Sequence, residues 1–293
     1  MRLLKFYNQI IKFGRECDPR DKKQEIKSYE DTAILYGAVD TEVKGIMLGI
    51  DIESPELLLA DNLRKRNKRI DLVISHHPEG KAYASLYEVM RLQVDLLIKA
   101  GICADVAQQL LEERMQEVLR KILPQNHMRT VDTASLLDIP FMCVHTPADN
   151  HASSFIQHLL DKEKPKKLKD ILEILYQIPE YKEAEKNNAG PRIILGNPNR
   201  TAGRIFVEMT GGTEGPKDSF ENLSKVGVRT IVAMHLSEEH FKKVRDTNLN
   251  VVIAGHISSD TLGLNLLLDK IERESKEEFD IFACSGFRRF KRY

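Results

Sequence analysis

The stretch Ile70-Asp71-Leu72-Val73-Ile74-Ser75-His76-His77-Pro78 indicates how the chain folds. Its apolar β-formers predict a short buried strand, which the proline ends. In α/β proteins the chemistry gathers at the carboxyl ends of such strands, and the two histidines stand at that end. Neighbouring strand residues point to opposite faces, so each histidine could hold one ion of a pair, or one could bind while the other packs.

A histidine pair beside a strand is often structural or exposed, but the same layout recurs twice in this chain. Short apolar strands also precede His145 and His256, and each of these histidines is followed four residues later by a carboxylate, Asp149 and Asp260. Leucines at helical spacing over residues 261–271 predict a helix after the last strand. His256 and Asp260 would then lie one helical turn apart, on one face of that helix.

Imidazoles and carboxylates from three strand ends make a mixed nitrogen and oxygen ligand set. Such a set suits zinc, iron, manganese or nickel better than calcium, and its lack of thiolates argues against a closed structural zinc site. The alternative is that the three strand ends are unrelated and that Asp149 and Asp260 serve as turn or cap residues. The repetition of the layout favours a shared metal site.

The bulk properties exclude several classes of protein. The chain has 293 residues, of which 42% are hydrophobic and 30% are charged, with a formal net charge of zero. It could form one large α/β domain or two smaller ones. A nucleic-acid-binding protein would normally show a basic excess, and a membrane span would need about 20 apolar residues, which this chain lacks. Four scattered cysteines without a C-x-x-C pair predict reduced thiols in a cytoplasmic protein.

Strand and helix patterns alternate along the chain, which predicts an α/β fold with mixed sheets covered by helices. We expect an N-terminal α/β lobe over residues 1–150 and a C-terminal α/β lobe over residues 151–293. Expected strands cover 32–36, 45–51, 70–75, 192–195, 204–208, 230–234 and 251–254, besides the one before His145. Expected helices cover 1–28, with a break near Asp18-Pro19, and 55–66, 83–123, split in two by a turn at Ala100-Gly101, 151–161, 167–177 and 238–247. A further helix is expected to open at the glycine turn Thr210–Pro216 and to end near Val226. Residues 181–191 are expected to form a loop, and the basic segment Arg288–Tyr293 a solvated tail.

Two further features lie near the expected site. The glycine-rich turn Thr210–Pro216 fits neither G-x-G-x-x-G nor G-x-x-x-x-G-K-[ST], and glycines at a tight strand-to-helix turn need no ligand. His235 follows the strand over 230–234, and we expect it near the site as a structural or ligand-orienting residue.

Several of these stretches together resemble the NGG-interacting-factor-three-like family, also known as the GTP cyclohydrolase I type 2 homologues. The matching stretches occur in the family's order between about residues 30 and 270. They are Gly49–Asp51, Asp71–Pro78, Val144–Asp149, the glycine turn Thr210–Gly215, and Ala254–Asp260.

The resemblance implies a two-lobed α/β protein, commonly a ring-shaped homohexamer, with a dinuclear metal site in the cleft between its lobes. Carried over by position, the metal ligands would be His76, His77, Asp149, His256 and Asp260, with His145 as a close neighbour. Two departures stand out. Asp260 takes the place of a glutamate that usually bridges both ions, and Ala233-Met234-His235 replaces a Thr-Gly-Asp-like turn.

Five ligands for two ions leave open coordination positions, as in catalytic sites. The sequence therefore indicates two divalent ions and metal-assisted hydrolysis of a small molecule, either a nucleotide ring or a phosphoester. His145 or His235 would shuttle protons or orient a ligand. The competing class is a non-enzymatic, metal-stabilised oligomeric assembly or regulatory factor. A third alternative is a structural α/β protein with incidental histidines.

Overall fold

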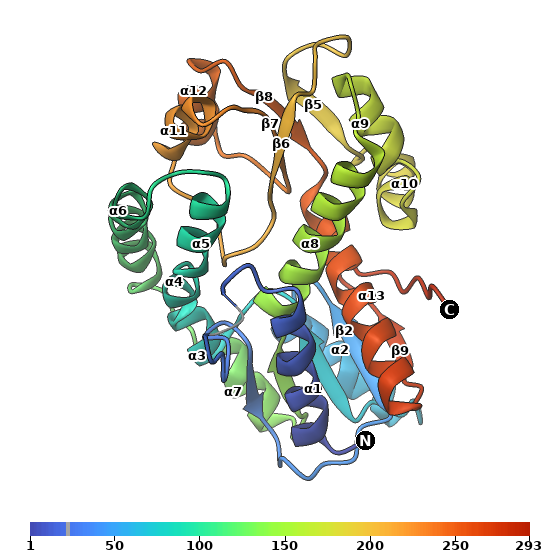
Figure 1. The fold of residues 1–293 in the computed structure, drawn as a ribbon. Helices are drawn as coiled ribbons and strands as arrows, with labels where there is room; N and C mark the ends of the chain where they lie inside the picture. The colour runs from blue at the N-terminus through green and yellow to red at the C-terminus, as the bar shows by residue number, and fades with distance from the viewer. Residues whose placement is uncertain (22–23) are drawn as a thin grey trace.

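Two mixed sheets form the framework of the protein. The computed structural model describes residues 1–21 and 24–293. The first sheet, in the lower part of Figure 1, has the order β1-β4-β3-β2-β9, and the second, in the upper part, has the order β5-β8-β7-β6. The strands of the first sheet are β1 (Ala33–Tyr36), β2 (Gly45–Gly49), β3 (Leu72–Ser75), β4 (Phe141–Cys143) and β9 (Asp280–Ala283). Those of the second are β5 (Arg192–Leu195), β6 (Arg204–Glu208), β7 (Val228–Ala233) and β8 (Asn250–Ile253). Only β1 and β5 run antiparallel to their neighbours.

Helices cover both sheets, so the expected α/β class with mixed sheets is confirmed. The helices are α1 (Leu3–Glu16), α2 (Ser54–Lys65), α3 (Gly80–Ala84), α4 (Leu86–Val89), α5 (Leu92–Lys99), α6 (Ala104–Ile122), α7 (Arg129–Leu136), α8 (Thr146–Glu163), α9 (Leu168–Leu175), α10 (Pro179–Lys186), α11 (Ser219–Lys225), α12 (Glu238–Arg245) and α13 (His256–Ser275).

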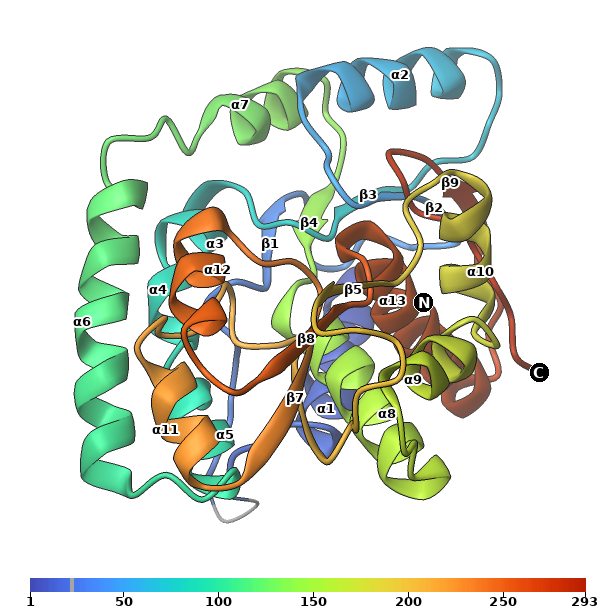
Figure 2. The same ribbon diagram turned by 90° about the horizontal axis from the view of Figure 1, so that it is seen from above.

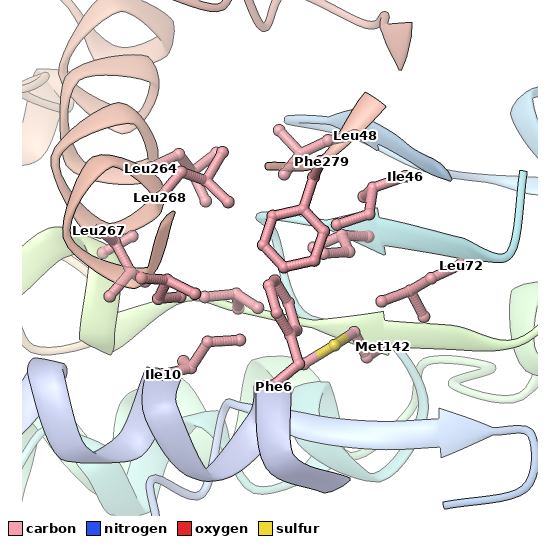
Figure 3. Packing of buried hydrophobic residues seen from close by; sticks show 14 of the residues in the cluster. Phe6, Ile10, Ile46, Leu48, Leu72, Met142, Leu264, Leu267, Leu268 and Phe279 are labelled. Carbon is pink, nitrogen blue, oxygen red and sulfur yellow. The ribbon is translucent and has the colours of Figure 1, made fainter. Parts of the chain in front are cut away.

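The first sheet is buried on both faces. Figure 2 shows α2 and α7 on one side of it and α1, α8 and α13 on the other. Leu72 and Ile74 of β3 pack toward α1 and α13, whereas Val73 packs toward α2 and α7, as the alternation of side chains along a strand requires. In the core under α1, the rings of Phe6 and Phe279 meet edge to face with centroids 5.2 Å apart (Figure 3).

The second sheet is covered in the same way. Its one face packs against α8 and α9 through residues such as Ile156 and Ile171, and its other face packs against α5, α11 and α12 through Leu97 and Phe220. Helices α8 and α13 contribute to the cores of both sheets. Ala148 and Leu264 belong to the first core, and Ile156 and Leu262 to the second. These two helices therefore connect the sheets.

A glycine allows α8 and α13 to approach closely. A Cβ atom at Gly263 would lie 2.3 Å from the carbonyl oxygen of Ala148, so no larger residue fits without moving one of the helices. Asp149 follows Ala148, and Asp260 lies one turn before Gly263 on its helix. The crossing thus brings the first turns of the two helices together.

Most expected elements are present, and the differences are instructive. The first helix ends at Glu16 rather than at residue 28, and residues 22–23 of that expected helix lie outside the described part. The expected break of the 83–123 segment at Ala100-Gly101 is confirmed, because it lies between α5 and α6. The part before this break is further divided, into the end of α3, α4 and α5, and α10 occupies the start of the expected loop. Helix α7 and strand β9 were not expected, because each is short and charged residues interrupt its apolar pattern.

The expected solvated tail is exposed at four of its six residues, but it is also tied to the protein by ion pairs. Arg292 Nη2 donates to both oxygens of the buried carboxylate of Glu180, at 2.6 and 2.7 Å, and Arg289 pairs with Asp269 at 2.7 Å. Just before this segment, β9 lies beside β2 in the first sheet, so the chain returns there after building the second sheet. The division into lobes at residue 150 remains a prediction.

Membrane-spanning helices and disulfide bonds can be assessed for the described residues. Within residues 1–21 and 24–293, none of the helices combines the length and the apolar character that crossing a bilayer requires. The four cysteines, Cys17, Cys103, Cys143 and Cys284, are all free thiols.

Candidate metal centre

Four histidines gather where strands of the two sheets end. His76 and His77 follow β3, His145 follows β4, and His256 begins α13 directly after β8. The ring centroids of His76 and His145 are 4.9 Å apart, and those of His77 and His256 are 5.0 Å apart. Because the carboxyl ends of parallel strands meet at one edge of a sheet, residues distant in sequence come together here.

Two carboxylates complete the cluster, and the crossing of α8 and α13 delivers both. Asp149 Oδ1 lies 3.3 Å from His76 Nε2, and Asp260 Oδ1 lies 3.5 Å from the same nitrogen. The other oxygen of Asp260 is 3.5 Å from His77 Nε2 and 3.6 Å from His256 Nε2. Asp260 therefore stands between two sets of imidazoles, with one oxygen toward each.

The potential ligand atoms form three overlapping groups in which all members lie within 4.8 Å of one another. Asp260 belongs to two of these groups. The groups are His76, Asp149 and Asp260; His77, His256 and Asp260; and His76, His77 and His145. All five residues expected as ligands thus lie in one cluster, and His145 lies beside them.

Hydrogen bonds orient three of the rings toward the cluster. His76 Nδ1 lies 2.9 Å from the carbonyl oxygen of Val144, so this nitrogen carries the proton and donates it. His77 Nδ1 is 2.6 Å from a carboxylate oxygen of Asp51, and His145 Nδ1 is 2.8 Å from one of Asp31. When Nδ1 is occupied in this way, Nε2 is the nitrogen that faces the cluster, as in histidines that bind metals.

Several polar atoms of the cluster form no hydrogen bond, which fits a site for a metal ion. His76 Nε2, Asp149 Oδ1 and both carboxylate oxygens of Asp260 are buried and form no hydrogen bond with other described residues. Buried polar atoms without partners are costly, and buried charges are normally paired or bound to metal. In the described part of the chain, every ion-pair partner of Asp149 and Asp260 is a histidine, and none is a lysine or an arginine.

The histidines respond to these carboxylates in opposite ways. Burial alone would lower the pKa of His76, but Asp260 and Asp149 outweigh it and raise the pKa to about 10. Burial is likewise outweighed at His77, where Asp260 and Asp51 raise the pKa to about 9. At His256 burial prevails and the pKa falls to about 4. His76 and His77 thus hold protons at neutral pH that a metal ion would displace.

His235, the other expected catalytic residue, lies next to the cluster but outside its ligand groups. It follows β7, and its ring centroid is 4.6 Å from that of His256. Its Nδ1 lies 3.4 Å from Glu214, whose carboxylate raises the pKa of His235 against the effect of burial. Glu214 itself accepts a hydrogen bond from the backbone of Ser237. The contact with Glu214 therefore fixes the imidazole of His235 at the edge of the site.

A cavity of about 660 Å³ opens beside the cluster. Four histidines line its wall on that side: His77, His145, His235 and His256. Tyr83 and Arg129 also line the cavity, and the glycine turn contributes Gly212 and Thr213. The volume lies within the range of small-molecule sites.

Sequence reasoning missed the residues that hold the histidines. Asp51 belongs to the Gly-Ile-Asp stretch at the end of β2, which could have indicated a site residue at a strand end. Asp31 and Glu214 carry no such signal. Asp31 precedes the antiparallel edge strand, and Glu214 lies within the glycine turn.

No protein-family model and no curated protein matches the chain, but solved structures do. A NIF3 superfamily protein from Sphaerobacter thermophilus is 25% identical over 95% of this chain and 98% of its own, with a TM-score of 0.75. Reduced HcgD from Methanocaldococcus jannaschii has the same fold, with 15% identity, coverage of 97% of each chain and a TM-score of 0.57. So does a Bacillus cereus protein related to NIF3, with 10% identity, coverage of 100% and 98%, and a TM-score of 0.53. This shared fold, together with the motifs, supports the resemblance of the chain to NIF3 superfamily proteins.

Proposed function

We propose that the protein binds two divalent metal ions in the candidate metal centre. His76 and Asp149 would hold the first ion, His77 and His256 the second, and Asp260 would contribute one oxygen to each. The observation that carries this proposal is the buried carboxylate of Asp260, whose two oxygens have no hydrogen-bond partner and face different imidazole sets. The absence of thiolates and the mixed donors favour zinc, iron, manganese or nickel.

We further propose that the protein is a hydrolase acting on a nucleotide or another phosphoester. A pair of divalent ions supplies the Lewis acidity that such a reaction needs. The 660 Å³ cavity beside the four histidines is large enough for a substrate of this class. Three finer expectations belong to the same proposal: a cleft between lobes 1–150 and 151–293, a homohexamer, and a cytoplasmic location.

The chain's own residues would then handle the proton. His145 has its Nδ1 bonded to Asp31, so its Nε2 can accept a proton at the wall of the cavity. His235 lies on the same wall and is held by Glu214, which suits it to donate a proton to the leaving group. Both histidines are within the reach of one small molecule in the cavity.

Metal content and turnover test the proposal together. The wild-type protein should contain about two ions per chain by plasma mass spectrometry and should hydrolyse at least one member of a panel of nucleotides and phosphoesters. His77→Ala should lose one ion or more and the activity. His158→Ala is the matched control, because His158 is exposed on α8 and bonds only within its own helix.

Each failure has a distinct meaning. A wild-type protein without metal overturns the whole proposal. Two ions per chain without turnover of any substrate, together with dissociation of an oligomer when a chelator removes the metal, identifies a metal-stabilised assembly instead of an enzyme.

A further inference from the structure

The residues just before β1 lie opposite those just after β4. Strand β1 is the only antiparallel member of its sheet, and Ala33 pairs with Cys143 in its register with β4. An antiparallel register pairs each step backward on one strand with a step forward on the other. Continued beyond the strand ends, it places Asp31 and Thr32 opposite His145 and Val144.

Three hydrogen bonds join the two segments there. Thr32 Oγ1 accepts from the backbone N–H of His145 at 3.1 Å. One carboxylate oxygen of Asp31, Oδ2, accepts from His145 Nδ1 at 2.8 Å and from the hydroxyl of Thr146 at 2.7 Å. Asp31 and Thr32 are 0% and 1% exposed, so water does not compete for these bonds.

Within residues 1–21 and 24–293, the buried carboxylate of Asp31 forms an ion pair with one group, the imidazole of His145. A buried carboxylate in this position costs free energy unless the groups around it carry compensating charge. Cations held in the adjacent centre would supply that charge, whereas a neutral core would not.

We infer that Asp31 and Thr32 are positioning residues that fix His145 and the first turn of α8 at the metal centre. This inference rests on the proposed metal-binding function. By occupying Nδ1, Asp31 selects the tautomer whose free Nε2 lies 3.6 Å from Asp149 Oδ2. By holding His145 and Thr146, the same two residues fix the start of the helix that carries Asp149.

Asp31→Asn is the appropriate test, because it keeps the shape of the side chain and removes its charge. Partners of this kind typically change metal affinity 10- to 100-fold when they are mutated. We therefore expect Asp31→Asn to weaken the binding of Mn²⁺ or Zn²⁺ by about 10- to 100-fold in calorimetric titrations. The thermal unfolding temperature of the metal-free variant should change little, because removing the cost of a buried charge offsets the weakening of the hydrogen bonds that Asp31 accepts.

Asp71→Asn is the matched control. Asp71 accepts two backbone hydrogen bonds, from Lys44 and Gly45, at the opposite end of the same sheet. This variant should lose stability and keep wild-type metal affinity. If Asp31→Asn shows the same pattern, the role of Asp31 is structural and the inference is overturned.

Long-range ¹H–¹⁵N spectra of the metal-free protein separate this inference from the proposed function. The His145 ring should show one tautomer, protonated at Nδ1, in the wild type. In Asp31→Asn the amide can present either its oxygen or its nitrogen to the ring, so the preference should weaken. A wild-type ring protonated at Nε2 alone overturns the inference whether or not metal binds, whereas absent metal binding with the expected tautomer overturns only the proposed function.

Discussion

Replacing Gly263 with alanine tests whether the crossing of α8 and α13 places the carboxylates of the metal centre. The new Cβ atom would lie 2.3 Å from the oxygen and 2.8 Å from the carbon of the Ala148 carbonyl. Ordinary contacts of a Cβ atom begin near 3.4 Å, so the helices must separate by about 1 Å. Both atoms belong to the backbone, and a close-packed core cannot absorb such a shift by a side-chain rotation.

The effect on stability should be smaller than the effect on metal binding. Overpacking costs about 1–3 kcal/mol, but alanine is a better helix former than glycine by about 1 kcal/mol. The net loss in the free energy of unfolding is therefore up to about 2 kcal/mol. Asp149 and Asp260 flank the crossing, and a metal site tolerates ligand displacements of only about 0.2 Å. A separation of 1 Å should thus abolish the binding of at least one ion.

The assay combines urea unfolding of the metal-free protein with metal analysis after dialysis against the metal. Gly227→Ala is the matched control, since its Cβ would meet no atom within 4 Å and strains only a backbone with φ of 91°. That control should lose stability and retain two ions per chain. If Gly263→Ala also retains both ions, the crossing does not position the carboxylates and the reasoning is refuted.

Three more predictions follow from the same geometry. His76, with a pKa of about 10, carries a proton at neutral pH that a metal ion must displace. The apparent affinity for metal should therefore rise with pH between about 6.5 and 9, by up to tenfold per pH unit for each proton displaced. Calorimetry in buffers of different ionisation enthalpy measures the number of protons released, and an affinity that does not change with pH contradicts the prediction. Asp260→Asn should release both ions and make the metal-free protein less stable at neutral pH, because the carboxylate raises the pKa of His76 and His77 and that stabilisation is lost with its charge. Plasma mass spectrometry showing two retained ions would exclude Asp260 as the shared ligand. The side-chain amide of Gln93 donates hydrogen bonds to the carbonyl oxygens of Gly211 and Thr213 in the glycine turn. Gln93→Ala leaves these carbonyls without that donor and should lower the free energy of unfolding by about 1–3 kcal/mol. Unchanged urea unfolding would show that other contacts fix this turn.

The sequence predicted the central strands and the clustering of the site better than the edges of the fold. β3, β5, β6 and β8 lie where short apolar runs predict them. In β3 and β8 the cause is burial on both faces, which leaves a clear apolar pattern. β9 was missed since it is short, flanked by charges and recognisable only through its pairing with β2. The five expected ligands come together because each follows a strand end or begins a helix, and those positions can be read locally.

The residues that orient the site could not be read in this way. Asp31 reaches His145 through the antiparallel register of β1 with β4, and the sequence contains no sign of which strands pair. Glu214 holds His235 from within a turn whose glycines suggest only flexibility. The basic segment Arg288–Tyr293 has the composition of a solvated tail, but its acidic partners, such as Glu180, lie on distant helices.

The position of β9 has a consequence for synthesis on the ribosome. Its pairing places Leu48 beside Cys284, a separation of 236 residues, so the first sheet lacks a strand while the second is being translated. The edge of β2 and the apolar side chains that pack around Phe279 stay uncovered until the residues of β9 have left the exit tunnel. A nascent chain of this protein is therefore open to strand-edge aggregation until late in its elongation, and molecular chaperones that shield such edges should increase its yield.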